Sequence, residues 1–440
     1  MKKHSTMANL IHAISKHDNS HHAVFPVPEN NTPLASNSVR VRTTLITLSS
    51  NNLTYARLGT TWGWWTAYPV PTAVAPPPYN DGDAWGIVPA WGYATVVAST
   101  ITALPSGATI YGYWPTTSHA VDLQLQPAAG IENHWIETSP HRQALMNMYN
   151  RYIPAPIPST ATPAAAAATA RRVALKPVWE CGYLFSRFNF PPAVVDQDGT
   201  GSSLLPVHPL GLPAPAALPW TARDADLRRA VVVGLAATSK TGRGFAWSLL
   251  RDRKEGGPLA VLQATSAPGK VRTYDDDVTT ARKNKAVGYG ELNGEEGVGW
   301  VLGFKPERVV VIDFGTRDGV LEGFVKAVEK EGKGVEVLVV LVGAGMKVYS
   351  EDEMKADAET AQRLKSVQFN TSTVRDWAME IEGPEAYFAK VNEAWERCEE
   401  EGGMGEFEAV WVDGVDGIEK AWQDLCDQKV KPDEAIVVRV

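Results

Sequence analysis

The segment that most constrains this 440-residue chain is 231–250, VVVGLAATSKTGRGFAWSLL. It begins with a continuous run of branched apolar residues, which is typical of a strand buried on both faces of a parallel sheet. A turn of small residues follows, and a helical pattern starts at about Gly242. The segment therefore predicts the first strand, turn and helix of a doubly wound, parallel-sheet domain.

The rest of the second half repeats this alternation of strand and helix. Such alternation indicates a parallel sheet with right-handed crossovers, an α/β architecture. Strands are predicted at 230–236, 259–264, 308–313 and 335–342, helices at 242–254, 318–331, 351–366 and 384–401, and a final helix and strand at 417–428 and 435–440.

The first half has a different pattern, with short β-rich stretches separated by Gly and Pro. This spacing favours a small barrel or sandwich and is too tight for helices between the strands. Residues 1–37 are polar and unpatterned, and we interpret them as a flexible N-terminal extension. The predicted strands are 39–48, 85–88, 93–99, 109–114 and 119–125, followed by a low-complexity linker at 154–170, a helix at 171–190 and a loop at 191–224.

Composition separates the same two halves. Residues 1–220 carry 12 Lys+Arg and 10 Asp+Glu, whereas residues 221–440 carry 30 and 40. Twenty-five of the 30 prolines lie in the first half, as expected where tight turns are frequent. The net charge of −8, without a basic stripe, argues against nucleic acid as a partner.

Cysteine usage and hydropathy indicate the compartment. The three cysteines, Cys181, Cys398 and Cys426, form no CxxC pair and cannot build a disulfide framework. No apolar run reaches the roughly 18–20 residues that a membrane span needs, and the N-terminus is a poor secretory signal. We therefore expect a cytoplasmic protein with no membrane partner.

The turn after the first parallel strand is the candidate cofactor site. In doubly wound sheets this turn faces the ligand crevice, and free N–H groups at the helix start favour phosphate. The candidate residues are Ala237, Ser239, Lys240 and Thr241. The segment matches neither G-x-G-x-x-G nor the P-loop, so an ordinary turn capped by Ser239 or Thr241 is the alternative.

The end of the second strand distinguishes NAD from NADP. An acidic residue there would bond the ribose of NAD, but residues 262–272, LQATSAPGKVR, contain no acid. Ser266 and Lys270 could contact a 2′-phosphate, which favours NADP(H). Gly343, after the strand at 335–342, is a further candidate because that strand end faces the same crevice.

The order of motifs resembles the medium-chain dehydrogenase/reductase superfamily, in its zinc-independent, quinone-reductase-like branch. Residues 48–59, LSSNNLTYARLG, resemble its hNxxDxxxxxG segment, and residues 85–97, WGIVPAWGYATVV, resemble its PxxxGxxxxGxV strand. Residues 104–112, LPSGATIYG, resemble xxxGDxVxG, with Ala108 in place of Asp. The words NNLTYARLG, WGIVPAWGYATVVAS and ATSKTGRGFA look more closely like an uncharacterised fungal and bacterial family allied to that superfamily.

The resemblance implies a GroES-like β-barrel domain and a Rossmann domain, with cofactor and substrate in the cleft between them. The implied GroES-like catalytic domain covers 38–184 and is completed by 401–440. The implied Rossmann-like NADP-binding domain covers 185–400. No Cys/His/Cys ligand set is present at the matching strand end, so no metal is expected.

The resemblance also suggests where the chemistry lies. Without zinc, hydride transfer relies on hydrogen bonds to the substrate carbonyl. The catalytic candidates are Tyr55, Asn52 and His119, and the substrate-binding candidates are Trp62, Trp64, Trp65, Tyr113 and Cys181. The alternatives are a core tyrosine, barrel packing of the tryptophans, a structural histidine and a small packing cysteine.

Together these patterns predict a zinc-independent NADP(H)-dependent oxidoreductase. Its substrate would be an enone, quinone or carbonyl of a small apolar or aromatic, secondary-metabolite-like molecule. A non-redox lyase or isomerase using the same cleft, or a non-catalytic NADP-binding protein, is the alternative. A homodimer is compatible with the sequence, which does not determine the oligomeric state.

Overall fold

The computed structural model describes residues 9–192, 206–211, 218–274 and 283–440, and it divides into two compact units. The first unit runs to Leu175 and also contains 346–350 and 407–440. The second unit contains 176–345 and 351–406. The first boundary falls inside a helix, upstream of the predicted boundary at 184. Parts of the predicted loop at 191–224 lie outside the described residues.

Antiparallel strands of the first unit close into a barrel, because β3 pairs with β5 along one edge and with β7 along the other. This is the GroES-like barrel. The C-terminal strand β17(Glu434–Arg439) pairs with β3, and β16(Glu408–Asp413) pairs with β17, so the chain end extends this sheet. Around the barrel the order is β3(Ser38–Leu48), β5(Pro89–Ser99), β6(Thr109–Pro115), β9(Arg151–Pro154), β8(Trp135–Glu137) and β7(Val121–Pro127).

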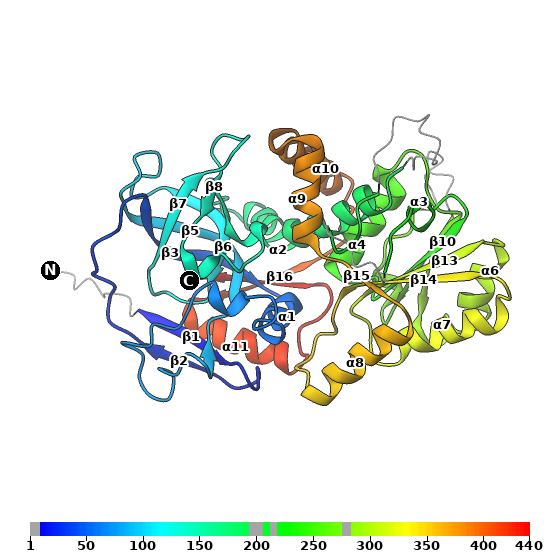
Figure 1. The fold of residues 1–440 in the computed structure, drawn as a ribbon, viewed down its shortest axis with the longest axis horizontal. Coiled ribbons are helices and arrows are strands. Elements are labelled where there is room, and N and C mark those ends of the chain that lie inside the picture. The colour runs from blue at the N-terminus through cyan, green and yellow to red at the C-terminus, as the bar shows by residue number, and fades with distance from the viewer. Residues whose placement is uncertain (1–8, 193–205, 212–217, 275–282) are drawn as a thin grey trace. The chain divides into compact units, whose positions relative to one another are not determined.

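An N-terminal hairpin packs on the barrel unit and corrects the prediction of a flexible extension at 1–37. Strands β1(Leu10–Ser15) and β2(His22–Pro26) are antiparallel, and β1 also pairs with β4(Trp85–Gly86). The side chains of Ile11 and Ile14 are completely buried. The hairpin lies beside helix α11(Gly414–Cys426) (Figure 1). Residues 1–8 lie outside the described part.

Two further predictions for the first half are wrong. A helix, α1(Ser50–Arg57), does fit between the barrel strands, because Ser49 and Asn52 form a capping box that starts it. The segment at 154–170 is not all linker, since α2(Pro163–Leu184) begins inside it. Its alanine run has high helix propensity, which outweighs its low complexity.

The second unit is a parallel sheet with the strand order of a Rossmann fold. Numbered from β10, the order reads 3-2-1-4-5-6, so the order reverses between β10 and β13. Across the sheet the strands are β12(Lys283–Gly288), β11(Ala260–Thr265), β10(Ala230–Leu235), β13(Arg308–Phe314), β14(Glu336–Gly343) and β15(Val367–Gln368).

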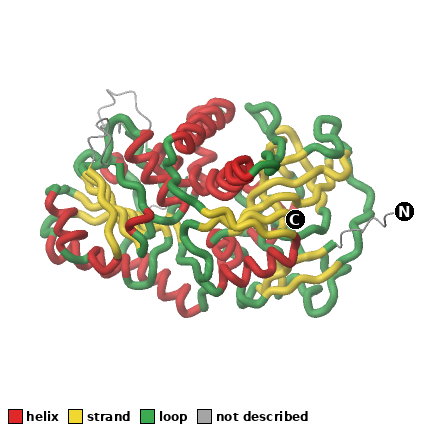
Figure 2. The backbone as a smooth tube through the Cα atoms, turned by 180° about the vertical axis from the view of Figure 1, so that it is seen from behind, coloured by secondary structure: helices red, strands yellow, loops and turns green. Residues whose placement is uncertain are grey.

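Helices cover both faces of this sheet. Val231 and Val233 of β10 share one core with Phe324 and Val328 of α7(Val320–Glu331). Figure 1 shows α4(Lys240–Trp247) on the opposite face from α7, and Figure 2 shows the strands running side by side between helices. The sheet is therefore buried on both sides, as the apolar strand sequences predict.

The remaining elements are short turns and outer helices. They are η1(Trp64–Thr66), η2(Pro140–Arg142), η3(Asn147–Asn150), η4(Phe185–Asn189), α3(Ala222–Ala225), η5(Ser248–Asp252), η6(Pro268–Lys270), α5(Tyr289–Leu292), η7(Glu295–Gly299), α6(Trp300–Gly303), α8(Glu351–Arg363), α9(Thr371–Glu382) and α10(Pro384–Glu400).

Candidate cofactor and substrate sites

The turn after β10 lies where the strand order of the second unit reverses. Ala236 adopts the left-handed conformation, with φ of 55°. The N–H of Ala237 donates to the carbonyl of Ala264 at 3.1 Å. The hydroxyls of Thr238 and Thr265 lie 2.8 Å apart in a hydrogen bond. These contacts fix the turn to the end of the neighbouring strand β11, so its backbone is held in one position.

Helix α4 begins directly at this turn. Ser239 is the N-cap, and its hydroxyl accepts the N–H of Gly242 at 3.0 Å. A Cβ on Gly242 would lie 2.9 Å from that hydroxyl oxygen, so the turn needs a glycine there. Lys240 and Thr241, both half-buried, occupy the first two helical positions. N–H groups at a helix start, with a lysine and no acid, suit a phosphate.

The end of β11 presents no carboxylate. Ser266 follows the strand directly and is exposed, and Lys270 is exposed in the turn η6. Arg272 is engaged elsewhere, since its guanidinium donates to the carbonyl of Glu401. A hydroxyl and an ammonium group at this position suit a 2′-phosphate better than a free ribose hydroxyl.

Gly343 lies where the turns after β13 and β14 meet. A Cβ on Gly343 would come within 2.5 Å of the carbonyl oxygen of Phe314. Gly315, with φ of 101°, is similarly close to the carbonyl of Ala344. Gly343 is thus at the carboxyl edge of the sheet, as predicted, and the close approach of the two turns explains why a glycine occupies it.

Two residues at this edge escaped the sequence analysis. Asp313 lies one residue before the end of β13, opposite Leu235 of β10. Burial raises the pKa of its carboxyl group to about 6, although the N–H groups of Gly315 and Thr316 bond to it. In a doubly wound sheet with the order 3-2-1-4, this strand end lies beside the turn after the first strand. That rule could have identified Asp313 as a candidate.

The second missed residue is Tyr289, which belongs to a glycine-rich, acidic segment. It follows β12 directly and begins α5. Burial raises the pKa of its phenol. Tyr289 therefore lies at the carboxyl edge of the sheet, directly after β12.

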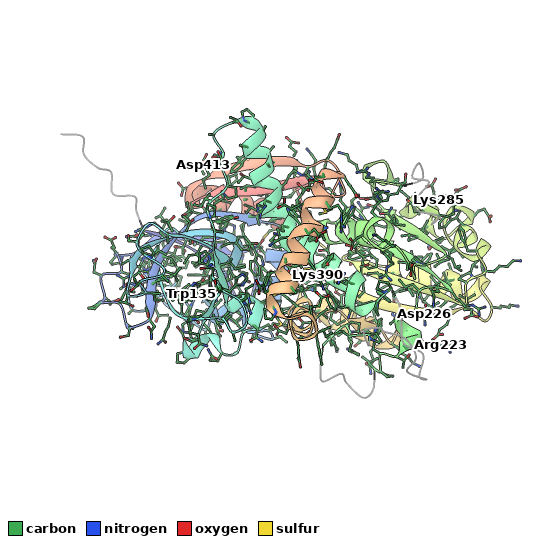
Figure 3. All side chains as sticks on the ribbon, turned by 90° about the horizontal axis from the view of Figure 1, so that it is seen from above. Trp135, Arg223, Asp226, Lys285, Lys390 and Asp413 are labelled. Carbon is green, nitrogen blue, oxygen red and sulfur yellow. The ribbon has the colours of Figure 1, made fainter. Side chains whose placement is uncertain are left out.

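The opposite, amino-terminal edge of the sheet is occupied by charges that already have partners. Arg223 pairs with Glu336 at 2.8 Å, where β14 begins. The guanidinium of Arg308, at the start of β13, donates to the carbonyl of Asp226 at 2.6 Å. Figure 3 shows Arg223 and Asp226 close together at this end. The arrangement stabilises the sheet and leaves the carboxyl edge as the candidate site.

The first unit contains a set of aromatic side chains around Tyr55. The Tyr55 oxygen accepts hydrogen bonds from Asn51 Nδ2 at 2.7 Å and Trp91 Nε1 at 3.1 Å. Its ring lies 4.7 Å from that of Trp64 and 5.2 Å from that of Tyr113, both edge-on. We call this set the Tyr55 cluster; it comprises Tyr55, Trp62, Trp64, Trp91, Tyr113 and Tyr149.

Two polar atoms of the Tyr55 cluster are buried without a hydrogen-bond partner among the described residues. They are the hydroxyl of Tyr113 and Nε1 of Trp64. Tyr113 is completely buried, and burial raises the pKa of its phenol well above the usual value. Leaving a buried donor unpaired costs about 1–3 kcal/mol, so these atoms mark a place suited to an oxygen atom of a ligand.

Two predicted residues of the first unit have other partners. The Asn52 carbonyl oxygen accepts the N–H of Ser49 at 2.8 Å, and its amide donates to Pro89 at 3.0 Å. The ring of Trp65 packs directly against Gly59 and Gly86. A Cβ atom on these glycines would lie 2.5 and 2.4 Å, respectively, from the ring. Both positions are explained by helix capping and core packing.

His119 and Cys181 do not belong to the Tyr55 cluster. His119 lies between β6 and β7 and lines a cavity to which no residue of the Tyr55 cluster contributes, within the part of the chain described. Cys181 belongs to the second unit, where its thiol donates to the carbonyl of Pro177 at 3.4 Å. Burial raises the pKa of this thiol to about 11, so it is un-ionised at neutral pH.

The described residues contain neither a cluster suited to a metal ion nor a helix suited to crossing a membrane. No group of three or more His, Cys, Asp or Glu side chains is arranged to hold a metal ion there. Within those same ranges, no helix has the length and apolar character that crossing a membrane requires.

Comparison with known proteins gives one family and a set of similar folds. A family described as "Protein of unknown function (DUF2855)" matches residues 46–431. CurA from Vibrio vulnificus in complex with NADPH has a TM-score of 0.48 at 10% identity, covering 98% of this chain and 99% of that one. A mutant enoyl thioester reductase from Candida tropicalis has a TM-score of 0.49 at 11% identity, covering 99% and 100%.

No curated protein sequence matches this chain. At such low identities and TM-scores, the two solved structures assign no ligand, activity or residue role here. Those must come from the residues of the chain itself.

Proposed function

This chain belongs to the DUF2855 family, and from its own residues we propose that it is a zinc-independent, NADP(H)-dependent reductase of the medium-chain dehydrogenase/reductase type. Its proposed substrate is the enone, quinone or carbonyl group of a small apolar or aromatic molecule, such as a secondary metabolite. The observation that carries the proposal is the turn of small residues at the point of strand reversal, which leads into the capped start of α4.

The cofactor proposal rests on the donors at the carboxyl edge of the second unit. We propose that Ala237, Ser239, Lys240 and Thr241 hold the pyrophosphate, because small side chains let the backbone approach it. Ser266 and Lys270 would hold the 2′-phosphate, since no acid ends β11 to repel it. Gly343 would leave room beside the turn after β13.

The substrate proposal rests on the Tyr55 cluster. Aromatic walls suit a flat apolar molecule, and the unpaired Tyr113 hydroxyl and Trp64 Nε1 suit its oxygen. Two donors to the Tyr55 oxygen stabilise the phenolate that forms when Tyr55 gives up its proton. We therefore propose Tyr55 as the proton donor to the reduced substrate. When bound, NADPH supplies the hydride that completes the reduction.

The first test is a fluorescence titration of the full-length protein with NADPH and NADH. We expect NADPH to bind at least tenfold more tightly. Ser266→Asp should reverse this preference, because a carboxylate repels the 2′-phosphate and accepts a ribose hydroxyl. Absence of binding at millimolar NADPH would overturn the cofactor proposal.

The second test follows NADPH consumption with a panel of quinones and enones. Tyr55→Phe should lower kcat by about 10²- to 10⁴-fold and leave the Kd for NADPH unchanged. Tyr79→Phe is the matched control, because Tyr79 stacks on Phe25 outside the Tyr55 cluster. NADPH binding without turnover of any acceptor would instead favour a non-redox enzyme or a non-catalytic NADP-binding protein.

A further inference from the structure

A cavity of about 180 Å³ lies in the first unit, away from the Tyr55 cluster. The N-terminal hairpin contributes Ile11, and the segment between β6 and β7 contributes Thr117 and His119. Its deeper wall also includes the buried side chains of Ile87 and Leu123. Exposed Asp122 and His141 stand at its rim. The hairpin therefore forms part of the cavity wall.

His119 lines this cavity and carries a buried polar atom without a hydrogen-bond partner among the described residues. The residue is 9% exposed, and its Nδ1 is buried with no hydrogen-bond partner among the described residues. Its backbone N–H donates to the Thr117 hydroxyl at 2.9 Å, which holds the residue in place. Burial, with the nearby charge of Arg42, lowers the pKa of the imidazole, so His119 is neutral at physiological pH.

Two other polar groups around the cavity, the Thr117 hydroxyl and the Asp122 carboxylate, are already paired. The Thr117 hydroxyl donates to the carbonyl of Leu10. The Asp122 carboxylate is held by Arg40, with 2.7 Å between Oδ1 and Nε. A charged ligand would thus meet no unpaired opposite charge among these groups. A neutral ligand with one oxygen would satisfy Nδ1 of His119 and cover the apolar wall.

The size of the cavity limits the ligand. An apolar cavity of about 150 Å³ in another protein holds one benzene molecule. We propose that this cavity binds a small neutral molecule about the size of one aromatic ring, carrying a hydroxyl or carbonyl group that bonds to Nδ1 of His119. This site is separate from the proposed cofactor and substrate residues, so its occupation does not depend on the proposed reductase activity.

The test compares phenol with toluene on the full-length protein. Saturation-transfer NMR gives the affinity, and ¹⁵N spectra of histidine-labelled protein follow Nδ1 of His119. We expect phenol to bind about three to ten times more tightly than toluene, because only phenol makes the hydrogen bond. We also expect the Nδ1 resonance to shift with phenol. No binding of phenol up to its solubility limit would overturn the proposal.

Two variants separate the hydrogen bond from packing. His119→Leu should remove the preference for phenol, whereas His119→Asn, whose amide lies near the position of Nδ1, should retain much of it. Both variants should keep the wild-type Kd for NADPH, which separates this test from that of the proposed function. Equal phenol affinity in wild type and His119→Leu would overturn the role of His119, and the ¹⁵N shift decides the question if a variant fails to fold.

Discussion

The carboxyl group of Asp313 is subject to two opposing influences. Two backbone N–H groups, from Gly315 and Thr316, stabilise its charged form at 2.9 and 2.7 Å. Burial opposes them and prevails, raising its pKa from 3.8 to about 6. The folded state therefore binds this proton more tightly than the unfolded state does. The stability that this group contributes is complete below about pH 4 and is lost as the pH rises through 6.

Asp313→Asn should consequently stabilise the protein at high pH. The amide oxygen can still accept both N–H groups, while the buried charge is removed. We expect a gain of about 1–3 kcal/mol near pH 8, shrinking toward zero near pH 4, measured by urea unfolding. Asp352→Asn, at an exposed position on α8, is the control. An equal effect of Asp313→Asn at both pH values would contradict this explanation.

Lys240 gives the second prediction for a single residue. If its ammonium group pairs with a cofactor phosphate, Lys240→Ala should weaken NADPH binding roughly tenfold, since a hydrogen bond to a charged group contributes about 1.5–3 kcal/mol. The effect should shrink in high salt, because salt screens the pair. Lys326→Ala, at an exposed position on α7, should leave the Kd unchanged. An unaltered Kd in Lys240→Ala would remove this residue from the site.

At the scale of elements, a glycine in each of the helices α2 and α4 lets the two helices pack closely. This contact positions the proposed phosphate site. A Cβ on Gly182 of α2 would lie 2.4 Å from the backbone nitrogen of Phe245 and 2.7 Å from the carbonyl oxygen of Thr241. A Cβ on Gly244 would lie 3.0 Å from Cα of Trp179. The two helices touch backbone to backbone, so α2 fixes the position of α4 and of its capped start.

Gly182→Ala should therefore be costly even though alanine favours helices. The added methyl group meets backbone atoms that cannot rotate away, so we expect a loss of about 1–3 kcal/mol in the free energy of unfolding. Gly303→Ala in α6, where no atom lies within 4 Å of the new Cβ, should be neutral or stabilising. Denaturant unfolding of both variants measures the contrast, and similar changes in both would contradict the close-contact explanation.

Across the whole molecule, segments far apart in sequence hold the first unit together. The N-terminal hairpin packs beside α11, where Nε1 of Trp422 donates to the carbonyl of Asn19 at 2.9 Å. His12 is completely buried, with its Nε2 3.1 Å from Nδ1 of His22. Burial, followed by the charge of His22, lowers the pKa of His12 to about 3. The fold thus requires a neutral His12.

Acid should accordingly weaken the first unit through His12. The unfolded state takes up a proton below about pH 6.5 and the folded state only near pH 3, so stability falls by up to about 1.4 kcal/mol per pH unit between these values. His12→Phe should flatten the loss of unfolding free energy between about pH 6.5 and 4. His21→Gln, at an exposed position, should not. Parallel pH profiles for wild type and His12→Phe would show that His12 is not responsible.

The parts of the molecule that the sequence predicted are those that depend on local patterns. The run of branched residues at 230–235, the small turn and the cap at Ser239 are encoded within twenty residues, and the structure contains all three. The absence of an acidic residue at the end of β11 is also a local feature. Ser266 and Lys270, which follow this strand in the sequence, lie at the carboxyl edge of the sheet. The prediction of a Rossmann sheet is therefore confirmed in its strand order.

Only the tertiary structure determined the features that require distant segments of the chain to meet. The hairpin at β1 and β2 has buried residues because β4 and α11 pack against it. The pairing of β3 with β7 closes the barrel, and burial raises the pKa of Asp313 against the effect of its two backbone N–H donors. The Nδ1 of His119 and the hydroxyl of Tyr113, which have no hydrogen-bond partner among the described residues, likewise depend on distant segments that bury them. Burial is a property of the surroundings of a residue, whereas periodicity and capping are properties of the chain beside it.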